Sequence, residues 1–200
     1  MHTSDEQVIG DDGVATWGRR LNHRQLLNDE HINVIFYYLR KKGKYNPPSN
    51  YSYTTVDCVF KIKVAELWEK YVDRQSCTSF VREEYVVCEY MNGYRLMAGI
   101  PWHTVDHVLI PLHVKERLHW VLIVVPFLDR CLYLYDLYNS VIHDVYVKIE
   151  VQKFAEVIAS FLLNINFYKK KINIDWQCHP KYRNRDESDL FEVIFVNDIP

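Results

Sequence analysis

Two short apolar runs joined by a turn are the feature that most constrains how this chain can fold. Residues 119–125 and 131–135 are rich in β-branched, leucine and tyrosine side chains, which favour strands. Residues 126–130 contain a proline and an aspartate, which favour a turn. The pattern therefore predicts an antiparallel hairpin with the His119 imidazole and the Asp136 carboxylate close together on neighbouring strands.

A histidine held by a carboxylate is a chemically specific arrangement. The carboxylate orients the imidazole and stabilises its protonated form, so that the ring can act as a general base toward a nucleophile. Taken alone, His119 is more often an ordinary residue at a strand end, and Asp136 a residue that closes a turn. The pair therefore indicates catalysis only in combination with further motifs.

The bulk composition indicates one globular domain. The chain has 200 residues, of which 48% are hydrophobic, and this is enough for a substantial core. Its formal net charge of −2 gives no overall attraction to nucleic acid or to an anionic membrane. The longest nearly apolar run, residues 120–128, is far shorter than the roughly 20 residues of a membrane helix. We therefore expect a soluble protein with no nucleic-acid or membrane partner.

The cysteines suggest reduced thiols. Five are scattered along the chain, at Cys58, Cys77, Cys88, Cys131 and Cys178, and none forms a C-x-x-C pair. The polar, acidic first residues do not look like a secretion signal. We expect an intracellular protein in the nucleus or the cytoplasm.

No cofactor is expected from the motifs. His103, His107 and His113 could share one face of a strand, but their spread and the lack of an H-E-x-x-H motif argue against a metal site. The basic clusters at 40–44 and 169–171 are expected to be a solvated helix end and a solvated loop.

The order of elements predicts an α+β domain. Residues 1–25 are expected to be a flexible N-terminal arm. Asn28 can cap a helix that ends at Gly43, after Lys41 and Lys42. The remaining expected elements are a helix over 59–71, strands over 105–114, 120–125 and 131–135, a helix over 147–165, a loop over 169–189 and a strand over 191–196.

Several segments, in order, resemble the SUMO- and ubiquitin-like-protein proteases (the sentrin-specific cysteine peptidases), and most of all a branch carried by plant mobile elements. Residues 26–32 resemble that family's Trp-Leu-Asn-Asp-x-x-Ile, and residues 108–113 resemble the strand before its catalytic histidine. His119-Trp120 and Tyr135-Asp136 match its His-Trp and Tyr-Asp pairs, and residues 191–200 resemble the strand that leads to its nucleophile. The resemblance implies a papain-like α+β cysteine-peptidase domain over residues 26–200.

By this resemblance, the activity is hydrolysis of the peptide or isopeptide bond after the diglycine of a ubiquitin-like (SUMO-type) protein. His119 would be the general base and Asp136 its orienting carboxylate. Trp120 would cover the narrow channel that admits the diglycine tail, where only residues without side chains can pass. Asp29 matches a position near the same tail.

The chain also departs from the family pattern. The family's nucleophilic cysteine and its oxyanion-hole glutamine would follow residue 200, so we expect the 200 residues to be C-terminally incomplete and to have negligible activity alone. Cys178, beside Gln177, is a poor substitute because adjacent loop side chains rarely reach one carbonyl. Leu26 and Leu137 stand where the family usually has tryptophan and serine.

Two other interpretations stay open. The chain could be a non-catalytic module that binds ubiquitin-like proteins through the Trp120 channel. It could also be a decayed, transposon-derived gene fragment without a stable fold.

Overall fold

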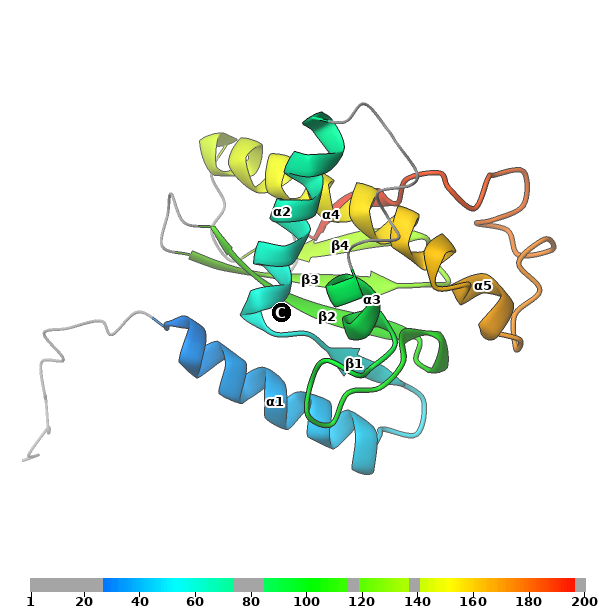
Figure 1. The fold of residues 1–200 in the computed structure, drawn as a ribbon, viewed down its shortest axis with the longest axis horizontal. Coiled ribbons are helices and arrows are strands. Elements are labelled where there is room, and N and C mark those ends of the chain that lie inside the picture. Colours follow the sequence, from blue (N-terminus) through cyan, green and yellow to red (C-terminus); the bar gives the residue numbers. More distant parts are fainter. Residues whose placement is uncertain (1–26, 74–84, 115–118, 137–140, 197–200) are drawn as a thin grey trace, which may run out of the picture.

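A computed structural model describes residues 27–73, 85–114, 119–136 and 141–196 of the chain (Figure 1). The predicted N-terminal arm, residues 1–25, lies outside this part. The elements are, in chain order, α1 (Asp29–Tyr45), β1 (Tyr53–Thr55), α2 (Cys58–Asp73), α3 (Tyr85–Met91), the 3-10 helix η2 (Trp102–Thr104), β2 (His107–Val114), β3 (His119–Pro126), β4 (Cys131–Tyr135), α4 (Val141–Asn164), α5 (Phe167–Lys170) and β5 (Glu192–Val196). The predicted α+β class is confirmed.

The strands form one mixed sheet in the order β1-β2-β3-β4-β5. β2, β3 and β4 are antiparallel neighbours, whereas β1 and β5 lie parallel to β2 and β4 at the two edges. The hairpin predicted from residues 119–135 is thereby confirmed, with Leu122 opposite Tyr135. The short edge strand β1 and the helix α3 are not predicted by the sequence patterns.

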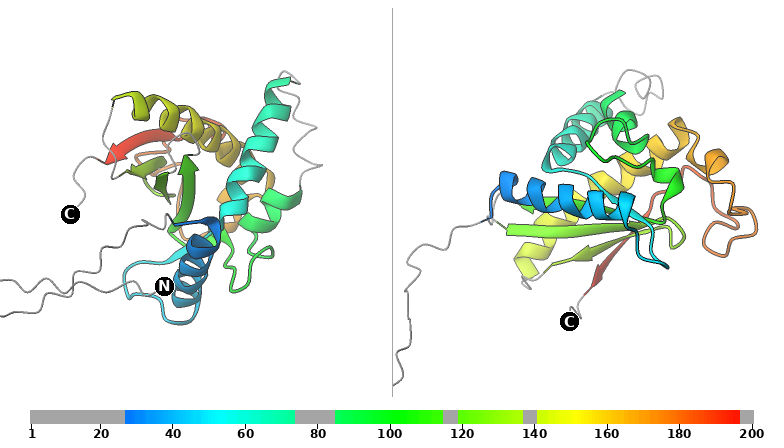
Figure 2. Two further views of the ribbon diagram at one scale, coloured as in Figure 1. Left: turned by 90° about the vertical axis from the view of Figure 1, so that its left-hand side faces the viewer. Right: turned by 90° about the horizontal axis from the view of Figure 1, so that it is seen from below.

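The two faces of the sheet have different surroundings. On one face, residues such as Ile110, Ile123 and Leu134 are fully buried in the main core, to which α2, α3 and α4 also contribute. On the other face, α1 lies along β1 (Figures 1 and 2), and its Ile32 and Phe36 pack near Leu122. We call the first the core face and the second the α1 face.

The start of α1 agrees with the predicted cap, but its end does not. The Asn28 side chain accepts a hydrogen bond from the His31 amide at 3.0 Å, and the His31 ring accepts one from the Asn28 amide. The helix continues past Gly43 to Tyr45, so the predicted stop at Gly43 is wrong. A Cβ at Gly43 would lie 2.6 Å from the carbonyl oxygen of Tyr53, so glycine here permits the close packing of α1 on β1.

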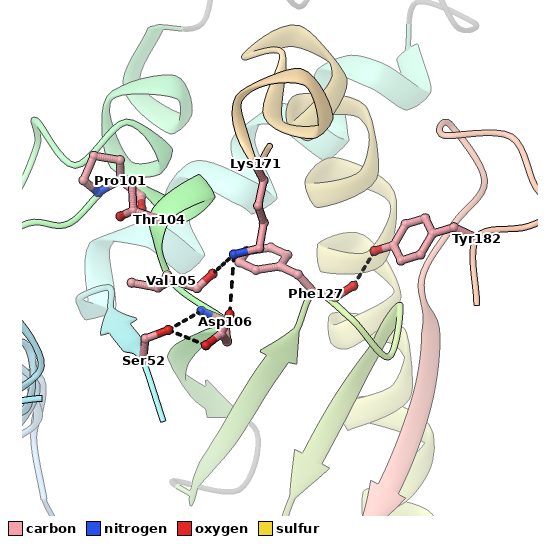
Figure 3. Close-up of polar contacts among 8 residues, drawn as sticks. All are labelled: Ser52, Pro101, Thr104, Val105, Asp106, Phe127, Lys171 and Tyr182. Carbon is pink, nitrogen blue, oxygen red and sulfur yellow. Dashed lines mark hydrogen bonds and ion pairs between the residues drawn. The ribbon is translucent and has the colours of Figure 1, made fainter. Parts of the chain in front are cut away.

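The buried Lys171, which follows α5, binds the residues that directly precede β2 (Figure 3). The Lys171 ammonium donates to the carbonyl oxygen of Val105 at 2.8 Å and lies 3.5 Å from an oxygen of Asp106. Asp106 in turn accepts a hydrogen bond from the Ser52 hydroxyl at 2.5 Å. Burial lowers the pKa of Lys171, and the Asp106 carboxylate opposes this shift. The prediction that residues 169–171 are a solvated loop is therefore wrong, because Lys169 and Lys170 belong to α5 and Lys171 is buried.

The long segment that follows Lys171 is fastened to the turn between β3 and β4. The Tyr182 hydroxyl donates to the carbonyl oxygen of Phe127 (Figure 3). The buried Arg130 guanidinium donates to the carbonyl oxygens of Asp186 and Asp189, at 2.5 and 2.9 Å. These contacts place the segment at the β3–β4 turn end of the sheet, before it enters β5. None of the helices in the described ranges is long and apolar enough to cross a bilayer.

We predict that Lys171→Ala lowers the free energy of unfolding by about 1–3 kcal/mol, because it leaves the carbonyl oxygen of Val105 without its donor in a buried place. Urea denaturation followed by circular dichroism measures this change. The exposed neighbour Lys169 supplies the control, Lys169→Ala, which should change stability by less than about 0.5 kcal/mol. Equal effects of the two substitutions would contradict the account.

Candidate active site

Four chain segments meet at one end of the sheet: the start of α1, the start of β3, and the ends of β4 and β5. β3 runs antiparallel to β4, and β4 runs parallel to β5, which places these three strand ends together. The Trp120 indole N–H donates to the carbonyl oxygen of Leu27 at 2.8 Å and so joins the start of α1 to β3. Residues distant in sequence thus form one local site.

His119 and Asp136 are in direct contact within this site. Nε2 of His119 lies 2.5 Å from Oδ1 of Asp136, and the two side chains are 20% and 10% exposed. The strand register explains the contact. Because Leu122 pairs with Tyr135, the next position along places Asp136 opposite Val121, and a diagonal neighbour on the same face can reach His119. The arrangement provides a hydrogen-bonded imidazole–carboxylate pair that is shielded from most of the solvent.

Trp120 points to the α1 face of the sheet, because successive side chains of a strand alternate between faces. There it packs against the small cluster of Ile32, Phe36 and Cys58. A groove of about 330 Å³ lies beside it, which we call the α1 groove. The α1 groove is lined by Ile32, Phe36, Pro111, Trp120, Val121, Leu122 and Tyr135. The structure therefore places one flat aromatic side chain at an apolar groove next to the His119–Asp136 pair.

Asp29 is the first residue of α1 and is exposed. It lies two positions after Leu27, whose carbonyl oxygen binds Trp120. Asp29 and Glu30 make the first turn of the helix acidic, where the positive end of the helix dipole stabilises them. The site thus has an acidic rim at the start of α1.

The lining of the α1 groove contains residues to which the sequence analysis assigned no role in the site. Phe36 and Pro111 face it from α1 and β2, and Tyr135 faces it from β4. The alternation along β2 and β3 contained the signal, since Leu109, Pro111 and His113 share a face with Trp120 once the strand register is known. The sequence patterns alone did not give the register between β2 and β3, so they could not show which residues share this face.

The buried thiols are poor nucleophiles. Burial raises the pKa of Cys58 to about 12 and that of Cys131 to about 11, and the nearby carboxylates of Asp29 and Asp57 add to the effect at Cys58. Burial also raises the pKa of Cys88. Because the thiolate is the reactive form, these three side chains stay protonated and unreactive at neutral pH.

Cys178 is exposed but lies at the wrong end of the sheet. It belongs to the segment that Tyr182 fastens to Phe127, just after β3, whereas His119 begins that strand. At a rise of about 3.3 Å per residue, the ends of β3 lie about 23 Å apart. A hydrogen bond to Asp175 also raises the pKa of the Cys178 thiol. Cys178 is therefore separated from the His119 imidazole and is not activated.

The three histidines considered for metal binding have other neighbours. His107 stacks on Tyr51 with ring centroids 4.1 Å apart, and His113 stacks on Trp120 at 4.6 Å. Burial and the nearby Lys170 and Lys171 lower the pKa of His103. Within the part of the chain that the structure describes, no group of three or more His, Cys, Asp or Glu side chains could hold a metal ion.

Comparison with known proteins gives the family. The sequence profile described as "Ulp1 protease family, C-terminal catalytic domain" matches residues 25–189, most of the chain. The chain therefore belongs to the Ulp1 protease family, a family of cysteine peptidases that includes the SUMO proteases. This match confirms the resemblance to that family, whereas the branch carried by plant mobile elements stays a prediction. No curated protein matches the sequence.

Solved structures of SUMO proteases are similar to it at low identity. The SUMO protease Ulp1 with its catalytic cysteine oxidized to a sulfinic acid is 14% identical, with a TM-score of 0.43, over 86% of this chain and 57% of that one. The C-terminal Ulp1 protease domain in complex with Smt3, the yeast ortholog of SUMO, is 13% identical, with a TM-score of 0.40, over 85% and 55%. The chain thus spans little more than half the length of these relatives.

We predict that the thiols differ sharply in reactivity. With a disulfide reagent at pH 8, Cys178 should react at once, whereas Cys58 and Cys131 should react only as fast as the protein opens, because burial keeps them protonated and covered. Mass spectrometry of tryptic peptides after timed labelling measures each rate. Fast labelling of Cys58 in the folded protein would contradict the assignment of these thiols as unreactive.

Proposed function

We propose that this domain is a cysteine-type peptidase that hydrolyses the peptide or isopeptide bond after the diglycine of a ubiquitin-like protein. The 2.5 Å contact between His119 and Asp136 is the observation that carries the proposal, because it supplies the base and its orienting group in a member of the Ulp1 protease family. One similar structure is a complex with Smt3, so we take a SUMO-type protein as the substrate. We propose that the protein acts in the nucleus or the cytoplasm.

The geometry assigns a separate task to each nitrogen of the His119 ring. Nε2 donates to the Asp136 carboxylate, so the other ring nitrogen, Nδ1, exchanges the proton with the nucleophile. Nδ1 takes the proton of a thiol, and Asp136 stabilises the resulting imidazolium. The imidazolium then returns a proton to the leaving amine as the thiolate forms a thioester with the substrate carbonyl. A water molecule, deprotonated by the same nitrogen, releases the carboxylate product and restores the thiol.

We place the nucleophile on residues that follow β5. Among the cysteines of the described ranges, Cys58 and Cys131 are buried and Cys88 is half-buried, each with a raised pKa, and Cys178 lies at the opposite end of β3. Parallel pairing of β4 and β5 sets Val196 beside Tyr135, so the chain leaves β5 next to Asp136. A cysteine shortly after β5 could therefore approach His119, which agrees with the family pattern.

The substrate tail is proposed to pass beside Trp120. The flat indole and the apolar lining of the α1 groove suit an extended chain without side chains, which is what a diglycine tail presents. The acidic rim of Asp29 and Glu30 lies close by and suits basic residues that precede such a tail.

We predict large losses of activity from the base and its carboxylate. The protein to assay is the chain with whatever residues follow Pro200 in its transcript, and the substrate is a SUMO-type protein with a fluorogenic amide on its C-terminal glycine. His119→Ala and Asp136→Asn should each lower kcat by about 10³-fold or more. Asp175→Asn, a carboxylate change at the opposite end of the sheet, is the control and should leave kcat unchanged.

The 200 residues alone should give negligible turnover of the same substrate. Turnover by these residues that disappears in Cys178→Ala would contradict our placement of the nucleophile. Full activity of His119→Ala would contradict the proposed mechanism as a whole.

A binding module for ubiquitin-like proteins is the second candidate function. The α1 groove and Trp120 are formed without any nucleophile, and this observation favours it. Two results together would support this function in place of the first. The chain would bind a SUMO-type protein saturably, and the chain with whatever residues follow Pro200 in its transcript would not cleave it.

A further inference from the structure

The Trp120 side chain rests on a second aromatic ring. His113 of β2 and Trp120 of β3 are direct partners in the antiparallel register. Their ring centroids are 4.6 Å apart and their planes are inclined by 24°, so the imidazole lies against one face of the indole. Nothing in the proposed mechanism uses His113.

The Trp120 indole has two further contacts, a hydrogen bond of its N–H and packing against α1. Its N–H donates to the carbonyl oxygen of Leu27, and its ring packs near Ile32 and Phe36. His113 itself is well placed to act as a support, because its own carbonyl oxygen accepts a hydrogen bond of 2.5 Å from the Lys61 ammonium of α2. The support is therefore tied to two different helices, α1 through Trp120 and α2 through His113.

We propose that His113 is a positioning residue that fixes the plane of the Trp120 ring, and thereby the clearance that the α1 groove leaves for a substrate tail. The effect on the tail rests on the proposed function, whereas the effect on the indole does not. With a small side chain at position 113, one face of the indole loses its support and the ring can tilt. A tilted ring leaves room for tails that carry side chains, and it lowers the affinity for a diglycine tail.

A flat ring is the property that matters at this position. The other residues that share this face of β2 near the groove, Leu109 and Pro111, carry no aromatic ring. Phenylalanine keeps a flat ring of similar size, whereas leucine has a comparable volume without one. His113→Phe and His113→Leu therefore form a matched pair that separates stacking from space filling.

The same strand supplies a control. His107 lies on the same face of β2 as His113 and stacks on Tyr51, with centroids 4.1 Å apart and planes inclined by 20°. His107→Leu removes an equivalent contact between a histidine and an aromatic ring, but at the other end of the strand from Trp120. Any general effect of losing such a contact should appear in both leucine variants.

The first readout is the indole N–H resonance of Trp120 in the 200-residue chain, assigned by its loss in Trp120→Phe. In His113→Leu this resonance should shift and its hydrogen exchange should accelerate about threefold to tenfold, as expected for one lost aromatic contact. His113→Phe should keep the slow exchange, and His107→Leu should leave both quantities unchanged. Equal exchange rates in His113→Leu and His113→Phe would overturn the proposal.

The second readout is binding of a SUMO-type protein that ends in Gly-Gly, compared with one that ends in Ala-Ala. Wild type and His113→Phe should prefer Gly-Gly, and His113→Leu should reduce that preference about threefold to tenfold. An unchanged preference in His113→Leu would overturn the role in tail selection. If wild type binds neither protein while the resonance behaves as expected, the proposed function fails and the positioning of Trp120 by His113 stands.

Discussion

The pairing register between β3 and β4 is the constraint on which the site depends. It sets Asp136 diagonally across from His119 on one face of the sheet, and strand alternation sends Trp120 to the other face. A slip of one residue would exchange these faces: the base would leave its carboxylate, and the indole would enter the core. Burial of Ile123 and Leu134 opposes such a slip, because both would have to leave the main core. The hydrophobic core and the imidazole–carboxylate pair are therefore specified by the same alternation.

The two ends of this hairpin have different tasks. At the turn, Arg130 and the Tyr182 contact with Phe127 fasten the long segment that precedes β5. At the open end, the starts of α1 and β3 and the ends of β4 and β5 come together around His119. Rigid contacts at one end thus direct β5 toward the other, where its last residues lie beside Tyr135. Cys178 lies at the turn end, away from His119. Its thiol therefore has no part in the site, although it is the most accessible of the described thiols.

Elements with strong local patterns could be predicted from the sequence. The hairpin, the Asn28 cap and the helix that carries Val151, Phe154 and Ile158 all follow from short-range periodicity or capping. β1 could not be predicted, because three residues carry too little pattern and its place depends on pairing with β2. Lys171 and Gly43 were misjudged for a related reason. A charged residue enters the interior only when distant partners such as Val105 meet it, and a glycine can serve close packing as well as the end of a helix.

For the site, the ordered resemblance to the protease family indicated His119, Asp136 and Trp120, whereas each residue taken alone did not. The sequence did not indicate that His113 supports Trp120, which requires the register of β2 against β3. The most direct test of the whole account is to treat the chain, with whatever residues follow Pro200 in its transcript, with a SUMO-type protein that carries a C-terminal electrophile. Peptide mapping should find the adduct on a cysteine after Val196, and His119→Ala should abolish it. An adduct on Cys58 or Cys178, one that forms equally in His119→Ala, or no adduct at all would contradict the account.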